Sequence, residues 1–151
     1  MKIMGLRTYK DSICWALIDG TSRLTATVVQ YGTLQIPTGE RGASLAWVRE
    51  EIFSLVAQEA PDCTVLCPAE GSTANNALIE RAQVDGVVLE AFHNLKAPVH
   101  SRKSATIRAQ FGAKSGSQLV SKLESVPAVS KIPKSSKRRD PIIGAIGELP
   151  G

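Results

Sequence analysis

Residues 13–19 read ICWALID, a nearly continuous apolar run of the kind found in a buried central strand. A strand is expected just before this run, at 2–7, because residues 8–12 between the two are the polar residues of a hairpin turn. Another strand is expected just after it, at 23–31, a stretch that is rich in threonine and valine and follows an aspartate–glycine turn. The chain therefore begins with an antiparallel meander.

Helices and strands alternate in the rest of the chain. The clearest helix is 45–59, whose apolar residues recur at helical spacing and form one stripe. The further expected elements are a strand at 64–67, a long helix at 73–94, a short strand at 97–100, short helices at 104–110 and 115–125, and a last helix starting at Asp140. Alternating units of this kind form parallel strands, and the initial meander excludes a plain Rossmann fold.

The distribution of charge along the chain is more informative than the total net charge of +4. Residues 100–139 contain ten basic side chains and one acidic side chain, whereas residues 1–99 contain eight basic and eleven acidic side chains. Such a block is typical of proteins with a polyanionic partner, although a solvated basic tail has the same composition. The 151 residues fit one domain, 1–151, in which the proline, serine and lysine residues around 126–139 predict a flexible basic connection.

No targeting or membrane segment is expected. The apolar runs fall well short of the ~20 residues that cross a bilayer, and charged residues interrupt the N-terminus where a signal peptide needs an apolar stretch. We therefore expect a cytoplasmic protein with no membrane partner. The cysteines, Cys14, Cys63 and Cys67, are odd in number, which in a reducing compartment favours buried thiols over disulfides.

The order of elements and five short stretches resemble the RNase H-like superfamily, in particular RuvC-type Holliday-junction resolvases. The stretches are MGL at 4–6 with the strand after it, residues 64–70, residues 99–108, GAKSGSQLV at 112–120 and RDPIIGAIG at 139–147. The resemblance implies a three-layer α/β fold. Its mixed five-stranded sheet starts with antiparallel hairpins, continues with parallel strands and carries helices on both faces. The resemblance also implies a nucleic-acid partner and a possible homodimer.

The resemblance further implies a metal site, because such enzymes hydrolyse phosphodiesters with Mg²⁺ held by acids from the first strand, the fourth strand and the last helix. Asp140 matches the last of these acids. Arg7 stands where the first acid is expected, and its cation would repel a metal or occupy the metal's place. Cys67 stands at the end of the fourth strand, with Glu70 three residues later. The candidate ligands are therefore Glu70, Asp140 and, in the first turn, Asp11.

Each candidate also has a simpler explanation. Asp140 before a proline is typical of a helix N-cap, and Glu70 before a glycine is typical of an exposed turn. Asp85 is expected to face solvent or to pair with Arg81, four residues earlier on one helix. A third group of candidates could bind phosphates or form a solvated basic face: Lys103, Arg108, Lys114, Lys137, Arg138 and Arg139.

Three functions follow, in order of preference. The first is a nucleic-acid-binding RNase H-like domain with a degenerate metal site, which binds through the phosphate backbone because aromatic residues are scarce. The second is an active, divergent Mg²⁺-dependent endonuclease in which Glu70 and Asp140 converge. The third is a protein-interaction or regulatory domain without nucleic acid, because one fold supports many functions.

Overall fold

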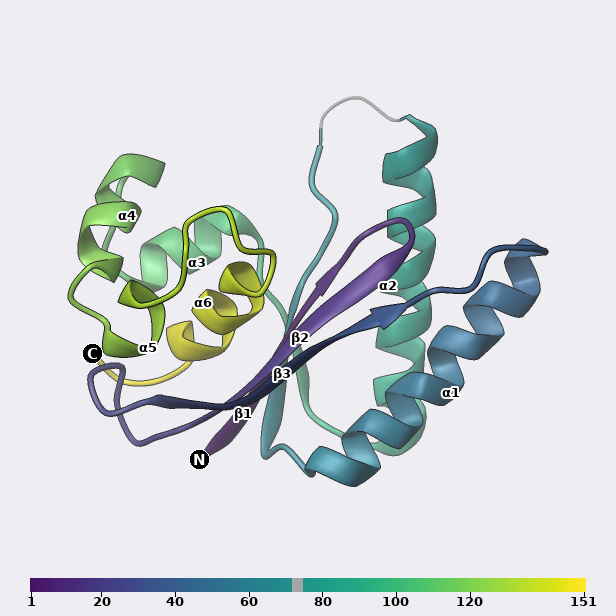
Figure 1. The fold of residues 1–151 in the computed structure, drawn as a ribbon, viewed down its shortest axis with the longest axis horizontal. Helices are drawn as coiled ribbons and strands as arrows, with labels where there is room; N and C mark the ends of the chain where they lie inside the picture. The colour runs from purple at the N-terminus through teal and green to yellow at the C-terminus, as the bar shows by residue number, and fades with distance from the viewer. Residues whose placement is uncertain (72–74) are drawn as a thin grey trace.

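The computed structural model describes residues 1–71 and 75–151, and its strands form one five-stranded sheet (Figure 1). The strands lie in the order β3-β2-β1-β4-β5. Their bounds are β1 Lys2–Thr8, β2 Ser12–Asp19, β3 Thr27–Gln35, β4 Cys63–Cys67 and β5 Val99–Ser101. The pairs β1–β2 and β2–β3 are antiparallel, whereas β1–β4 and β4–β5 are parallel. The predicted mixed sheet, a meander followed by parallel strands, is confirmed.

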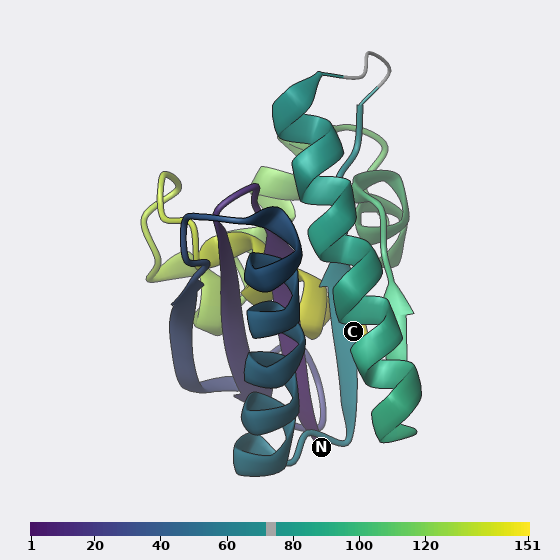
Figure 2. The same ribbon diagram turned by 90° about the vertical axis from the view of Figure 1, so that its right-hand side faces the viewer.

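Helices cover both faces of this sheet, as predicted. Their bounds are α1 Arg41–Glu59, α2 Asn76–Leu95, α3 Ser104–Gln110, α4 Gly116–Leu123, α5 Pro127–Ser130 and α6 Arg139–Gly147. Helices α1 and α2 lie on one face, and α6 lies on the other with α3, α4 and α5 around it (Figures 1 and 2). No helix in the described ranges is both long and apolar enough to span a bilayer.

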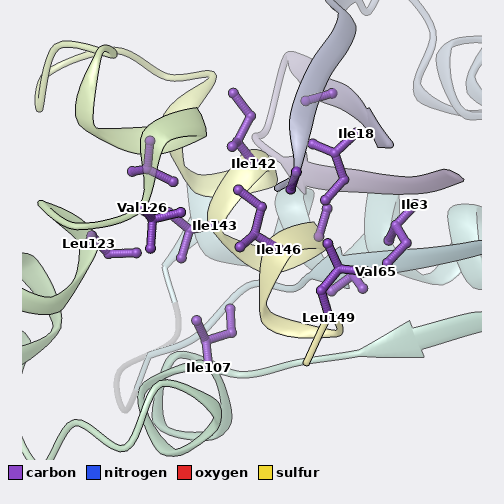
Figure 3. Close-up of a cluster of buried hydrophobic side chains, with 14 of the residues drawn as sticks. Ile3, Ile18, Val65, Ile107, Leu123, Val126, Ile142, Ile143, Ile146 and Leu149 are labelled. Carbon is purple, nitrogen blue, oxygen red and sulfur yellow. The ribbon is translucent and has the colours of Figure 1, made fainter. Parts of the chain in front are cut away.

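Each face of the sheet has its own hydrophobic core, because side chains alternate between the faces along every strand. On the α6 side, Ile3, Ile18 and Val65 pack against Ile142 and Ile146 (Figure 3). On the α1–α2 side, the alternate strand residues Met4, Leu6, Trp15, Leu17 and Leu66 pack against the two long helices. A strand that is buried on both faces needs apolar residues at every position, which explains the continuous run at 13–19.

Gly5 lets the last helix approach the sheet closely. A Cβ atom at this position would lie 1.8 Å from the carbonyl oxygen of Pro141, so any side chain would push α6 away from β1. Gly144 has the same role on the helix itself, since a Cβ there would lie 2.8 Å from the Cys67 sulfur. These two glycines bring the first turn of α6 next to the ends of β1 and β4.

Helix starts differ from the predicted ones. Helix α1 begins four residues earlier, at Arg41, because the Glu40 carboxylate accepts hydrogen bonds from the backbone N–H groups of Gly42 and Ala43. The predicted start of the second long helix, residue 73, lies outside the described residues, and α2 is described from Asn76 onward. An apolar stripe marks only the buried part of a helix, so it does not reveal a polar cap one turn earlier.

The segment 126–139, which we expected to be a flexible connection, packs against the core. It contains the one-turn helix α5, and the side chains of Val126, Val129 and Ile132 are buried. Arg139 is also buried, and its guanidinium donates hydrogen bonds to the carbonyl oxygens of Val129 and Ile132. Widely spaced apolar residues among prolines and lysines gave no periodic signal, so this packing was not visible in the sequence.

Candidate functional site

The ends of β1 and β4 and the start of α6 meet at a cavity of about 250 Å³. Arg7, Glu70 and Asp140 all line it, so the three positions singled out by the resemblance share one cavity. We call this cavity the arginine cleft, because its lining includes four arginines from four different segments: Arg7, Arg81, Arg102 and Arg108.

Arg7 and Asp140 form an ion pair in the arginine cleft. Arg7 lies next to Cys67 in the parallel register of β1 and β4, and Asp140 lies in the first turn of α6. The interpretation of Asp140 as a helix N-cap is therefore wrong: α6 has no side-chain cap, and the carboxylate accepts a hydrogen bond from the Arg7 guanidinium instead. The Nε atom of Arg7 is buried and has no hydrogen-bond partner among the described residues.

Glu70 holds the start of α3. Its carboxylate accepts hydrogen bonds from the backbone N–H of Ser104, at 2.9 Å, and from the Ser104 hydroxyl. The hydroxyl and backbone hydrogen bonds from Ser104 outweigh partial burial and keep the pKa of Glu70 below its ordinary value, so the carboxylate stays ionised. Glu70 thus lines the cleft, and both groups that donate hydrogen bonds to it belong to Ser104, the first residue of α3.

Arg81 ties helix α2 to the ends of the two central strands. Its guanidinium donates hydrogen bonds to the Thr8 hydroxyl at 3.2 Å and to the carbonyl oxygens of Cys67 and Pro68 at 3.2 and 3.0 Å. Burial, and then the nearby positive charge of Arg7, lowers the pKa of Arg81. Two guanidinium groups are therefore held close together at one end of the sheet.

Asp85 corrects another expectation, since it is buried and does not face solvent. It accepts hydrogen bonds from the Thr8 hydroxyl and, at 2.8 Å, from the backbone N–H of Ala69. No ion pair joins Asp85 to Arg81 among the described residues; the two side chains contact the same Thr8 hydroxyl. Asp85 therefore fixes the chain that leaves β4 toward the cleft.

Arg102 lines the other side of the cleft and already has an acidic partner. It donates hydrogen bonds to both carboxylate oxygens of Glu148, at 2.7 and 3.2 Å, and Gln110 donates a further one at 2.7 Å. The hydrogen bonds from Arg102 lower the pKa of Glu148, and those to Glu148 raise the pKa of Arg102. Arg81 and Arg108, by contrast, form no ion pair within the described part of the chain.

A second group of cations surrounds Tyr9, in the turn between β1 and β2. Arg7, Arg81 and Lys137 have their charged atoms 5.3, 5.8 and 4.8 Å from the centroid of its ring, within the range of cation–π attraction. The hydroxyl of Tyr9 is protonated at neutral pH, like that of an ordinary tyrosine, and burial raises its pKa further. Beside it lies a groove of about 460 Å³, which we call the hairpin groove, lined by Tyr9, Lys10, Asp11, Ala77, Leu78, Arg81 and Lys137.

The structure separates the other predicted residues. Asp11 lines the hairpin groove and not the arginine cleft, so it does not join Glu70 and Asp140. Lys103 and Lys114 are exposed at the starts of α3 and α4. Arg138 lies over the ring of Tyr31, 4.3 Å from its centroid, and lines a different cavity. Arg139 is buried against backbone carbonyl oxygens and is not available to a phosphate, which corrects its assignment to a nucleic-acid surface.

The donor set of the cleft does not fit a divalent metal ion. Asp140 is paired with Arg7, Glu70 is bound to Ser104, and the described residues contain no group of three or more acidic, histidine or cysteine side chains placed to hold a metal. Cys67 offers no thiolate either, because burial raises its pKa to about 12. Mg²⁺ requires several anionic or neutral oxygens, whereas this cavity is lined by four guanidinium groups.

Sequence reasoning missed Arg81, Arg102 and Tyr9. Arg81 gave no signal because it lies on a long helix whose spacing suggested a local ion pair with Asp85. Arg102 lies within the stretch 99–108 that carries the resemblance, so attention to charge in that stretch could have found it. Tyr9 lies among the polar residues of the hairpin turn, and only the folded chain brings three cations to its ring.

Comparison with solved structures identifies the fold. RuvC of Thermus thermophilus is similar with a TM-score of 0.78 and 12% identity, covering 97% of this chain and 92% of that one. T. thermophilus RuvC in complex with a Holliday junction substrate is similar with a TM-score of 0.76 and 12% identity, covering 97% of this chain and 91% of that one. The yeast mitochondrial Holliday junction resolvase is similar with a TM-score of 0.66 and 8% identity, covering 96% of this chain and 77% of that one. No protein-family model and no curated protein sequence matches the chain. The predicted RNase H-like fold of RuvC type is confirmed.

Proposed function

We propose that this chain, which has the RuvC-type RNase H-like fold, binds nucleic acid and holds a backbone phosphate in the arginine cleft without hydrolysing it. The observation that carries this proposal is the ion pair between Arg7 and Asp140. It occupies the position where the resemblance places metal-binding acids. A guanidinium group supplies the positive charge that binds a phosphate, but it does not activate water as a bound metal ion does.

The charges of the cleft support an anionic ligand. Glu70 and Asp140 are the acids that line it, and Glu148 neutralises Arg102 from behind, so the four arginines are incompletely compensated. Arg108 has no acidic partner in the described structure, and the partly exposed guanidinium of Arg7 lines the same cavity. Planar guanidinium groups bind phosphate oxygens with two parallel hydrogen bonds, so both side chains are suited to a phosphodiester.

The hairpin groove supports a path for the strand beyond this phosphate. Arg81 lines both cavities, so the two adjoin. Lys137 and Lys10 extend the positive charge along the groove, and the protonated hydroxyl of Tyr9 is a further donor. A backbone that runs from the cleft into the groove would meet Arg108, Arg7, Arg81 and then Lys137. Such a series of cations binds largely independently of base sequence.

One of the similar structures is RuvC in complex with a Holliday junction substrate, and another is a Holliday junction resolvase. We therefore take branched DNA as the preferred partner. The alternative of an active endonuclease requires Glu70 and Asp140 to leave Ser104 and Arg7 for a metal ion. The alternative of a protein-interaction domain leaves the uncompensated arginines unexplained. A homodimer stays a prediction from the resemblance, and static light scattering would check it.

The test measures the binding of a labelled four-way DNA junction and of a labelled linear duplex by fluorescence anisotropy. Gel electrophoresis of the same DNA then shows whether it has been cleaved. With about four phosphate contacts, we expect affinity to fall about a hundredfold between ~50 and ~200 mM salt. The affinity should be the same in Mg²⁺ and in EDTA, and the DNA should stay intact. Absence of binding at ~50 mM salt, or Mg²⁺-dependent cleavage, would show that the proposal is wrong.

A further inference from the structure

Strand β3 presents a long unprotected edge. It is nine residues long, lies at one end of the strand order and, within the described structure, pairs only with β2 (Figure 2). Its sequence TVVQYGTLQ contains no charged residue and no proline, although edge strands of stable proteins usually carry such residues to prevent pairing with other chains. Val29 and Tyr31 are about half exposed, at 54% and 51%.

An apolar groove of about 410 Å³ runs beside this edge, on the α6 side of the sheet. One wall is the start of β3, where Val28 and Tyr31 line it, and the opposite wall is α5, through Pro127 and Ala128. The floor includes Ala26, Ile132 and Ile142, which belong to the core of this face. We call it the β3 groove. It shares no lining residue with the arginine cleft.

Two cations border the β3 groove, and no acidic residue lines it. Lys131 is exposed at the end of α5. Arg138 lies over the ring of Tyr31, lines the groove and forms no ion pair among the described residues. Its guanidinium is therefore suited to bind a carboxylate supplied from outside.

We infer that the edge of β3 and the β3 groove bind an extended segment of another protein. The segment adds to the sheet as a further strand beside β3, with main-chain hydrogen bonds along the free edge. Side chains of a strand alternate between the faces of a sheet, so residues two apart point to the same side. The segment that fits places an apolar side chain in the β3 groove and, two residues away, a carboxylate on Arg138 and Lys131.

The chemistry of the groove favours such a segment over nucleic acid or a second copy of the chain. Its floor and walls are largely apolar, which suits a leucine or valine side chain and not a phosphate backbone. The strand itself, TVVQYGTLQ, has no acid, so a second β3 would bring no carboxylate to Arg138. This inference is independent of nucleic-acid binding by the arginine cleft.

The test uses nine-residue fluorescein-labelled peptides of serine and threonine that contain one leucine and one glutamate. In the first peptide these two are separated by one residue and share a face; in the second they are adjacent and point to opposite faces. A third peptide has glutamine in place of glutamate. We expect anisotropy to show that the first peptide binds about tenfold more tightly than each of the others.

Variants of the protein locate the binding. Val28→Trp fills the β3 groove and should abolish binding of the first peptide, whereas Thr33→Trp, on the same face of β3 outside the groove, should leave it unchanged. Arg138→Gln should weaken binding of the first peptide, which contains glutamate, about tenfold and leave binding of the glutamine peptide unchanged. Comparing the two peptides on the same variant corrects for any loss of protein stability. Both tryptophan variants should still bind DNA.

Three results would overturn the inference. Equal affinity for all three peptides, or for wild type and Arg138→Gln, would remove the carboxylate from the site. A dimer in light scattering that Val28→Trp, but not Thr33→Trp, converts to a monomer would mean that a second copy occupies the edge. A loss of DNA binding in Val28→Trp alone would assign the groove to nucleic acid.

Discussion

Arg7, at the end of β1, forms an ion pair with Asp140, in the first turn of α6. The pair joins two of the segments at which the resemblance predicts metal-binding acids. It exists because Gly5, two residues before Arg7, lets α6 pack directly on β1. The same packing that would assemble a metal site therefore assembles a salt bridge here, and the positive charge at this point comes from the chain itself.

The close approach of α6 predicts the effect of Gly5→Ala. The new methyl group would overlap the carbonyl oxygen of Pro141, so we expect a loss of about 3 kcal/mol in the free energy of unfolding, measured in urea. Gly86→Ala in α2 is the control, because a Cβ there meets nothing within 4 Å. It should stabilise the protein by about 0.5 kcal/mol through helix propensity. Equal effects of the two substitutions would contradict the packing described for α6.

Substitution of Arg108 should change how DNA binding depends on salt concentration. Arg108→Gln removes a cleft cation that has no acidic partner, so the slope of log affinity for DNA against log salt should become shallower by about 0.9. Lys122→Gln removes the same charge from the exposed side of α4, away from the cleft, and should leave the slope nearly unchanged. If both variants shift the slope equally, general charge and not the cleft determines binding.

The proposed exchange of a metal position for a cation predicts that a site can be restored. Arg7→Asp removes the partner of Asp140 and adds a second carboxylate beside it, with Glu70 in the same cavity. Because two like charges are relieved by a divalent cation, Mg²⁺ should raise the Tm of this variant by about 3 °C and leave wild type unchanged. Lys122→Asp on α4 makes the same change of charge at an exposed position that has no acidic partner among the described residues, and it should not respond. A Tm shift in wild type would show that the cleft already accepts the metal.

Glu148 predicts how stability depends on pH. Its folded pKa lies below the ordinary value of about 4.3, chiefly because of hydrogen bonds from Arg102. A carboxylate with a depressed folded pKa stabilises the fold above its unfolded pKa, and this contribution is lost as the pH falls through the folded value. We therefore expect wild type to lose stability below pH ~4.3, and Glu148→Gln to lose less over the same range. Parallel pH profiles in urea unfolding would refute this role.

Much of the fold was predictable from local pattern. The run at 13–19 predicted a strand that is buried on both faces, and the meander followed by alternating units predicted the mixed sheet. The convergence of Arg7, Glu70 and Asp140 was also expected, but from the resemblance alone. What the pattern could not give were contacts between segments. Arg81, on α2, donates hydrogen bonds to the carbonyl oxygens of Cys67 and Pro68 at the end of β4, and nothing in its own helix indicates these partners.

The sequence likewise does not predict which basic residues are exposed and which are buried. Lys137 and Arg139 lie two residues apart in one basic run, yet Lys137 faces the ring of Tyr9 and Arg139 is buried against α5. The difference arises because α5 and the residues after it fold back onto α6, which a pattern of prolines and lysines does not predict. Composition places ten basic residues at 100–139, but it does not show that one of them, Arg139, is buried.

The affinity of the Arg7→Gln and Asp140→Asn variants for a four-way DNA junction in EDTA tests the central claim most directly. If Arg7 binds the phosphate in place of a metal, Arg7→Gln should weaken binding about tenfold, and Asp140→Asn should strengthen it severalfold by releasing the guanidinium. Unchanged affinity in both variants would contradict the account. The account would also be contradicted if wild type cleaved the junction in Mg²⁺ and Asp140→Asn abolished this cleavage. Asp140 would then bind a metal ion instead of pairing with Arg7.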